Sequence, residues 1–181
     1  MTVEIRGLRP SDDRQAFRSG DEALDLFFHR YAGQNQFRHH VGTTYVAVET
    51  ESILGFVTVS PGSLDAGDLA SGRRMPPYPV PILRVARLAV DDSARGRGLG
   101  KALLRFAIEL AERLMRDFGC VGVVVDAKPA AVEFDRRFGF TPVDVVEGVT
   151  AQRPEPTTLF LPLGSVPRKG PDQLPAQRRF R

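Results

Sequence analysis

The order of apolar and polar positions predicts a strand near the start of the chain and a hairpin after residue 40. Apolar and polar residues alternate over 2–8, as in a strand with one buried face. The segments 43–50 and 52–60 are rich in Val, Ile and Thr, and one residue separates them. We therefore expect these two segments to pair as a hairpin.

A helix is predicted between the first strand and the hairpin, because apolar residues recur there at helical spacing (Leu24, Phe27, Phe28 and Tyr31). Ser19 lies three residues before Glu22, which is the spacing of a capping box. We expect the helix to begin at this pair.

The second half of the chain reads as strand, helix, strand. The segment 82–90 is strongly apolar, residues 99–118 carry apolar side chains at helical spacing, and 121–127 is apolar again. A crossover of this length makes the two strands parallel. A short helix follows, with Pro129 near its first turn and Gly139 at its end, and then two more strands. The predicted class is a mixed α/β sheet flanked by helices.

Two segments stand outside this pattern. Residues 61–81 are rich in Gly and Pro, and a loop this long inside a compact domain is usually functional. Residues 165–181 carry five basic residues against Asp172 and little that can be buried. We expect one domain over 1–164 and a disordered, solubilising tail over 165–181.

Composition limits the class of protein. The 181 residues are 42% apolar, which is enough for one buried core. We expect no secretory signal, because no apolar stretch follows a basic start at the N-terminus. We expect no membrane span, because the best candidate stretch is interrupted by Arg84 and Arg87. Cys120 is the only cysteine, so no intrachain disulfide forms and a reducing cytoplasm is the expected location.

The glycine-rich stretch before the second helix predicts an anion site. Gly96, Gly98 and Gly100 leave the backbone bare where a helix begins, and a helix N-terminus binds phosphate. A P-loop requires glycine where Arg95 stands, and a dinucleotide fingerprint requires glycine where Lys101 stands, so neither motif fits.

The pattern Arg95-x-x-Gly98-x-Gly100, entered from a strand and leaving into a long helix, resembles the diphosphate loop of the GNAT N-acetyltransferase family. The later stretch "AAVEFDRRFGF" fits the order of parts in that family. The resemblance implies a GNAT fold whose two central parallel strands splay to admit acetyl-CoA. It also implies a set of coenzyme-binding residues: Leu88, Ala89, Val90, Arg95, Gly96, Arg97, Gly98, Leu99, Gly100, Lys101 and Phe134.

The segments 17–28, 78–91 and 125–134 are similar to a narrower group, the acetyltransferase toxins of toxin–antitoxin pairs. Those proteins acetylate the α-amino group of aminoacyl-tRNA. This resemblance implies charged tRNA as acceptor, a ribbon–helix–helix antitoxin and a homodimer as partners, and no membrane.

One residue departs from that group. Asp135 stands where the resemblance places a tyrosine that protonates the departing thiolate, and an ordinary carboxyl is ionised at neutral pH. Three explanations stay open. Tyr78 or Tyr45 could supply the proton, burial could keep Asp135 protonated, or the protein could be a solitary acetyltransferase with another substrate. A catalytically impaired coenzyme A sensor is the contrasting class.

The remaining candidate residues point less clearly to a catalytic or binding role. Glu49 and Asp126 are the nearest carboxylates for a general base, and we interpret each as an ordinary strand-end charge. A missing strong base favours an acceptor amine of low pKa, such as an aminoacyl ester. No metal is expected, because the histidines (His29, His39 and His40) lack ligand spacing. Arg73 and Arg74 are candidates for contact with a phosphate-rich substrate.

Overall fold

The computed structural model describes residues 2–65, 67, 69, 75–143 and 156–165. The strands and helices follow one another in the order β1 (Glu4–Gly7), α1 (Glu22–Leu26), η1 (Phe27–Tyr31), α2 (Ala32–Gln34), η2 (Asn35–His39), β2 (Thr43–Glu49), β3 (Ser52–Leu64), β4 (Val80–Val90), η4 (Asp92–Ala94), α3 (Leu99–Asp117), β5 (Gly122–Ala127), α4 (Val132–Arg136), β6 (Thr141–Pro142), β7 (Thr157–Pro162) and η5 (Leu163–Ser165).

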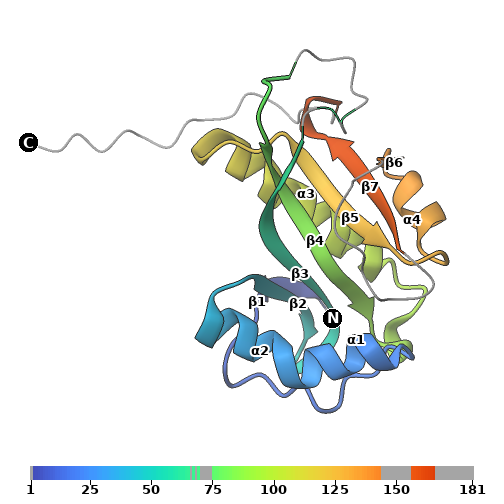
Figure 1. The fold of residues 1–181 in the computed structure, drawn as a ribbon. Helices are drawn as coiled ribbons and strands as arrows, with labels where there is room; N and C mark the ends of the chain where they lie inside the picture. The colour runs from blue at the N-terminus through green and yellow to red at the C-terminus, as the bar shows by residue number, and fades with distance from the viewer. Residues whose placement is uncertain (1, 66, 68, 70–74, 144–155, 166–181) are drawn as a thin grey trace, which may run out of the picture.

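The strands form one mixed sheet in the order β1-β2-β3-β4-β5-β7-β6. Strands β4 and β5 are parallel, and every other neighbouring pair is antiparallel. Helix α3 makes the crossover between the two parallel strands (Figure 1). The predicted mixed α/β class, the hairpin of β2 and β3, and the parallel strand–helix–strand unit are therefore confirmed.

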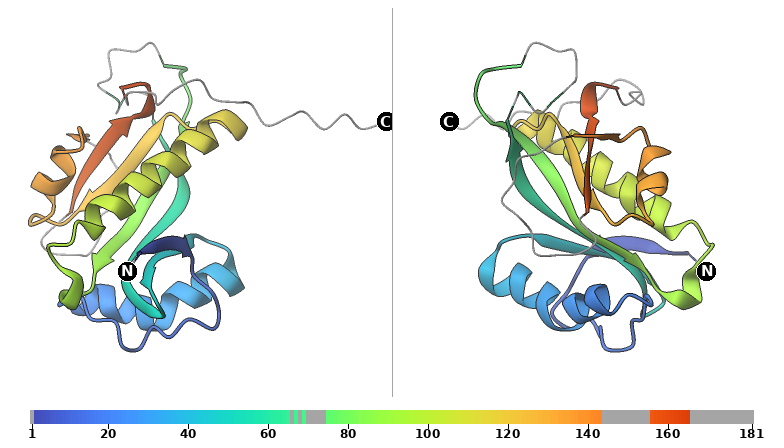
Figure 2. Two further views of the ribbon diagram at one scale, coloured as in Figure 1. Left: turned by 180° about the vertical axis from the view of Figure 1, so that it is seen from behind. Right: turned by 45° about the vertical axis from the view of Figure 1, so that its right-hand side comes forward.

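The two faces of the sheet are covered by different helices (Figure 2). On one face, α3 buries a stripe of apolar residues against strands β3, β4, β5 and β7. On the other face, the helical segment from α1 to η2 covers one end of the sheet. Its Phe28 stacks on Phe56 of β3, with ring centroids 4.4 Å apart.

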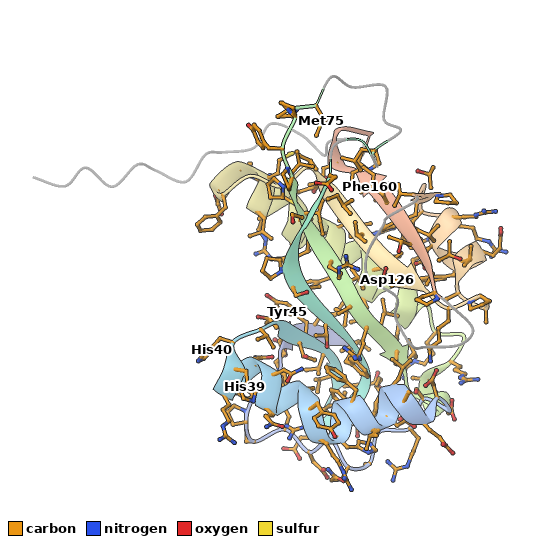
Figure 3. The ribbon with its side chains drawn as sticks, viewed as in Figure 1. His39, His40, Tyr45, Met75, Asp126 and Phe160 are labelled. Carbon is orange, nitrogen blue, oxygen red and sulfur yellow. The ribbon has the colours of Figure 1, made fainter. Side chains whose placement is uncertain are left out.

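A third apolar cluster closes the far end of that second face, where Met75 and Phe160 lie (Figure 3). Between this cluster and the α1 helix, the sheet carries polar and charged side chains in place of apolar ones. Arg84 of β4 and Asp126 of β5 lie in that middle zone. We call this middle zone the open face.

The predicted start of the first helix is wrong. Asp21, and not Ser19, is the N-cap, and its carboxylate accepts hydrogen bonds from the N–H groups of Ala23 and Leu24 at 3.1 Å each. The hydroxyl of Ser19 instead donates to Asp25 at 2.6 Å. Gly20 separates the two residues with φ of +78°, so the chain turns before the helix begins.

The long loop is shorter than predicted. Strand β3 continues to Leu64 and β4 begins at Val80, so both strands run into the predicted loop of 61–81. The segment 141–148 contributes the two-residue strand β6, and its residues 144–148 lie outside the described part of the chain. Arg73, Arg74 and the tail from residue 166 onward also lie outside it.

Candidate active site

Strands β4 and β5 pair over only part of their length. Three residue pairs are in register, ending with Val85 opposite Val125, and β4 continues for five residues beyond them. The register between β3 and β4 also shifts here, from Thr58 opposite Arg87 to Val59 opposite Val85, which leaves Ala86 as a bulge. The segment Ala86–Val90 is therefore free of β5, as the predicted splay requires.

The glycine loop lies at the open end of this split. Gly96 and Gly98 have φ of +77° and +78°, in the left-handed region where side chains are disfavoured. A Cβ atom at either position would meet nothing within 4 Å, so both glycines border open space. Gly98 is the N-cap of α3 and provides no side chain to satisfy the first N–H groups of the helix.

A hollow of about 360 Å³ between β2, β3 and α3 is lined by neutral side chains and His40, whereas the one at this loop, about 330 Å³, combines backbone donors with the charges of Arg95 and Lys101. It is bordered by Val90, by the loop and first turn of α3, and by Phe134 of α4. A Cβ on Gly100 would lie 3.6 Å from Val90 and 3.7 Å from Phe134, which are ordinary contact distances, so the first turn of α3, β4 and α4 come together at this residue. The bare turn, the unpaired helix N–H groups and the cationic rim suit a diphosphate.

The three cations of the loop are not equivalent. The Arg95 guanidinium pairs with Asp92 at 2.7 Å and donates to the Ser19 carbonyl at 2.5 Å. The Arg97 guanidinium pairs with Glu49 at 2.7 Å, and this carboxylate raises the Arg97 pKa. Lys101 also borders the hollow, and among the described residues its amine has no ion-pair partner.

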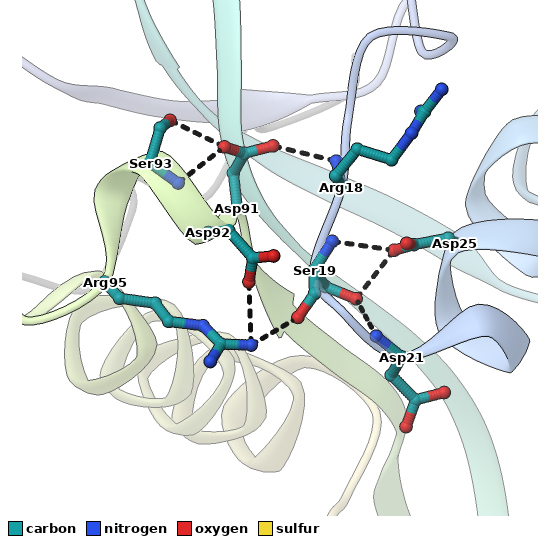
Figure 4. A network of polar contacts seen from close by, with 8 residues as sticks. All are labelled: Arg18, Ser19, Asp21, Asp25, Asp91, Asp92, Ser93 and Arg95. Carbon is teal, nitrogen blue, oxygen red and sulfur yellow. Dashed lines mark hydrogen bonds and ion pairs between the residues drawn. The ribbon is translucent and has the colours of Figure 1, made fainter.

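A polar network fastens the loop to the segment before α1 (Figure 4). The Asp91 carboxylate accepts from the N–H and hydroxyl of Ser93 and from the Arg18 N–H at 2.8 Å. Sequence reasoning missed this role of Asp91. The signal was present, because Asp two residues before Ser at a strand end is typical of an Asx turn.

Asp135 is buried, with 7% of its surface exposed. It follows Phe134 on α4 and has no hydrogen-bonding or ion-pairing side-chain partner among the described residues. Burial raises the pKa of its carboxyl to about 6. At pH 7 roughly one tenth of such groups would carry the proton, so burial alone leaves Asp135 mostly ionised.

The two tyrosines offered as replacements lie elsewhere. Tyr78 precedes β4 and is 62% exposed, and the glycine loop follows the other end of that strand. An eleven-residue strand is about 33 Å long, so Tyr78 is distant from the hollow. Tyr45 packs on Phe106 of α3, with ring centroids 4.7 Å apart, and borders the other hollow, of about 360 Å³. The structure does not bring either residue to the glycine loop.

The two carboxylates considered as bases are both ion-paired. Glu49 pairs with Arg97, and Asp126 pairs with Arg84 on the open face. In the described ranges no group of three His, Cys, Asp or Glu side chains is placed to hold a metal ion. None of the helices in the same ranges is long and apolar enough to cross a membrane.

Comparison with known proteins agrees with this geometry. Residues 40–142 match the acetyltransferase (GNAT) domain. A tRNA-acetylating toxin of Mycobacterium tuberculosis is 33% identical over 146 residues, which cover 77% of this chain and 86% of that protein.

Solved structures show the same fold. A structure of AtaT complexed with acetyl-methionyl-tRNAfMet superposes with a TM-score of 0.78 at 25% identity, covering 91% of this chain and 96% of that one. A structure of AtaTR bound with AcCoA gives a TM-score of 0.73 at 26% identity, covering 90% and 95%. The protein belongs to the GNAT family of acetyltransferases and is closely similar to tRNA-acetylating toxins.

Proposed function

We propose that the protein transfers the acetyl group of acetyl-CoA directly to a primary amine, and that this amine is the α-amino group of an aminoacyl-tRNA. The observation that carries the proposal is the glycine-lined hollow at the N-terminus of α3, opening onto the split between β4 and β5. The similarity to a tRNA-acetylating toxin supports the choice of acceptor.

The donor side of the split would hold the coenzyme mainly through backbone groups. The diphosphate lies against the N–H groups of Leu99, Gly100 and Lys101, with the Lys101 amine adding charge. The pantetheine arm enters the split and pairs with the free edge of β4 over Leu88–Val90. A β4 N–H beside the bulge at Ala86 then stabilises the oxyanion of the tetrahedral intermediate.

The acceptor fits the chemistry of the site because the attacking amine must be neutral. A peptide-like α-amine is neutral in roughly 10–20% of molecules at pH 7, whereas a lysine amine is neutral in well under about 0.1%. Glu49 and Asp126, the two carboxylates considered as general bases, are both already paired with arginine. An aminoacyl ester therefore needs less help from the protein than a lysine does.

Asp135 is the group we assign to protonation of the departing thiolate. Its carboxyl pKa is about 6 because it is buried, and a bound coenzyme would remove more water and raise the pKa further. The amine nitrogen bonds to the carbonyl carbon and the amine proton leaves to solvent. The C–S bond then breaks as the tetrahedral intermediate collapses, and the Asp135 proton moves to the sulfur. Phe134, the residue before Asp135, borders the hollow beside the glycine loop.

A second candidate function rests on the same residue. Because Asp135 is mostly ionised in the free protein at pH 7, a coenzyme A-binding module without turnover would also suit the site. Such a module would act as a sensor or would bind a partner protein.

Thiol release from acetyl-CoA, measured with a panel of aminoacyl-tRNAs and small primary amines, tests these functions. Release with aminoacyl-tRNA alone supports the proposed toxin-like activity, and release with small amines alone supports a solitary acetyltransferase. Tight coenzyme binding by calorimetry without any release would establish the sensor. The toxin-like activity also implies a cytoplasmic location, a homodimer and a ribbon–helix–helix antitoxin, which co-expression with the product of a neighbouring gene would test.

A further inference from the structure

Asp126 occupies the point at which the two central strands separate. The last registered pair of β4 and β5 is Val85 opposite Val125, and Asp126 is the next residue of β5. The bulge at Ala86 lies across from it on β4. Asp126 therefore stands at the closed end of the split, where the thioester of a coenzyme entering from the glycine loop would end.

The Asp126 side chain is on the open face, away from α3. Val123, Val125 and Ala127 of β5 belong to the core under α3, so the alternation of the strand directs Asp126 to the other side. Figure 3 shows it in the middle of the sheet, between the α1 end and the Phe160 end of that face. The donor hollow thus lies at the open end of the split, and Asp126 lies at its closed end on the face away from α3.

Side chains of the two neighbouring strands hold the Asp126 carboxylate. Arg84 of β4 donates to Oδ2, and the Thr158 hydroxyl of β7 donates to Oδ1 at 3.0 Å. A carboxylate has about four lone-pair sites, so these two bonds leave acceptor capacity. The side chain of Asp126 is 28% exposed, and that exposed part faces the open side of the sheet.

We propose that Asp126 binds the amino group of the acceptor, and that Arg84 and Thr158 position its carboxylate for this purpose. The inference rests on the proposed acetyl transfer and adds the residue that holds the acceptor. An ammonium is attracted to the carboxylate, and the neutral amine formed from it still donates a hydrogen bond there. With one N–H directed to Asp126, the nitrogen lone pair is free to face the thioester carbon.

The pairing with Arg84 suits a carboxylate that binds the acceptor amine and does not itself remove the amine proton. It keeps Asp126 in one orientation and balances its charge before the acceptor arrives. Two other basic side chains of this region, Lys128 and Arg87, also have partners. Lys128 pairs with Asp21, and the Arg87 guanidinium packs 4.0 Å above the Phe27 ring.

The experiment compares Asp126→Asn with wild type in the full chain, using acetyl-CoA and the acceptor that gives the fastest thiol release in the panel above. We expect the acceptor KM to rise about 10- to 100-fold, because a hydrogen bond to a charged group is lost. The Kd of acetyl-CoA by calorimetry should stay within about two-fold, because the coenzyme is held by the glycine loop. Asp126→Glu should recover part of the acceptor affinity.

Asp12→Asn is the matched control. Asp12 forms a similarly shielded pair with Arg6 at 2.8 Å, at the edge of the sheet near β1, and touches nothing at the split. It should lose stability without any change in acceptor KM. Thr158→Val, which removes one hydrogen bond and keeps the charge, should raise the acceptor KM about 2- to 5-fold and serves if Asp126→Asn does not fold.

The outcomes separate the inference from the function on which it rests. Unchanged acceptor KM in Asp126→Asn and Thr158→Val, with an active wild type, overturns the role of Asp126 alone. So does a weaker acetyl-CoA Kd with unchanged acceptor KM, which would make the Arg84–Asp126 pair a brace that sets the width of the split. A wild type that releases no thiol with any acceptor overturns the transfer reaction and this inference together.

Discussion

The two sides of the β4–β5 split are built from different parts of the chain. The donor side is one continuous stretch, in which Gly96, Gly98 and the first turn of α3 offer backbone N–H groups and open space. The open face is assembled from side chains of separate strands, such as Arg84, Asp126 and Thr158. Backbone donors keep their chemistry whatever the side chains are, whereas a site made of side chains from several strands can be altered by single substitutions.

The largest expected effect comes from a substitution that blocks the donor side. Gly98→Asp should weaken acetyl-CoA binding by at least about 100-fold in calorimetry, because it adds a negative charge at the helix N-terminus and strains a left-handed residue. Gly98 has φ of +78° and its Cβ would point into open space at the hollow.

Gly119→Asp is the control for that change. Gly119 lies just beyond the other end of α3 with φ of +90°, and a Cβ there would come no closer than 3.9 Å to Pro81. It receives the same charge and the same backbone strain, so it should cost stability and leave acetyl-CoA affinity unchanged. Equal losses of affinity in both variants would show that the hollow at Gly98 is not the coenzyme site.

The next effect concerns Asp135, the proposed proton donor on α4. Asp135→Asn should lower kcat about 100-fold or more while leaving acetyl-CoA Kd nearly unchanged, because it removes a general acid. In wild type, kcat should fall as pH rises past the carboxyl pKa of the bound complex, which starts from about 6 in the free protein. An undiminished kcat would show that the thiolate leaves unaided.

The same variant should be more stable than wild type. The folded-state pKa of Asp135 is raised from 3.8 to about 6, so the native state binds the proton more tightly than the unfolded chain does between these values. Native stability therefore falls as pH rises through that window. Asp135→Asn should gain at most about 3 kcal/mol in urea unfolding at pH 8 and almost nothing near pH 4. A buried carboxylate that costs stability but supports turnover is the behaviour expected of a catalytic group.

The contrast between one continuous stretch and side chains from separate strands also explains which features the sequence predicts. The glycine loop and the periodicity of α3 are local, and they predict the parallel unit and the loop at which the structure has the hollow that we propose for the coenzyme. Arg84 and Asp126 are 42 residues apart, so no local pattern joins them, and Asp126 was interpreted as an ordinary charge. Ser19 failed as a cap for a related reason, because its hydroxyl and carbonyl are engaged by Asp25 and Arg95.

A smaller effect is expected where α1 meets the end of β5. Asp21 caps α1 and also pairs with Lys128, the residue that follows β5. The pair therefore links the start of α1 to the end of β5. Asp21→Ala should lower the free energy of unfolding by about 1 to 2 kcal/mol, mostly through loss of the cap. Asp21→Asn keeps a good cap and removes the pair, so it should cost less than half as much, measured by urea unfolding at pH 7.

The pH dependence of that contribution has the opposite sign to that of Asp135. Burial raises the Asp21 carboxyl pKa, but the Lys128 and Leu24 hydrogen bonds outweigh it and hold the pKa below its usual value. Its stabilising effect is therefore present above pH 4 and is lost as the carboxyl is protonated in more acidic solution. Equal stability of Asp21→Ala and wild type at pH 7 would contradict both roles.

The smallest effects decide whether the donor side is already formed before the coenzyme binds. Lys101→Ala should weaken acetyl-CoA binding about 5- to 10-fold, because its charge at the hollow is unpaired among the described residues. Arg97→Ala should weaken it by about two-fold or less, because Glu49 already takes up the Arg97 charge at a largely exposed site. Glu49→Gln should tighten binding slightly by freeing Arg97. The reverse order, with Arg97→Ala the more damaging change, would mean that Arg97 leaves Glu49 for the diphosphate. The donor side would then not be fully formed before the coenzyme binds. It would depend on a charged side chain, as the open face does.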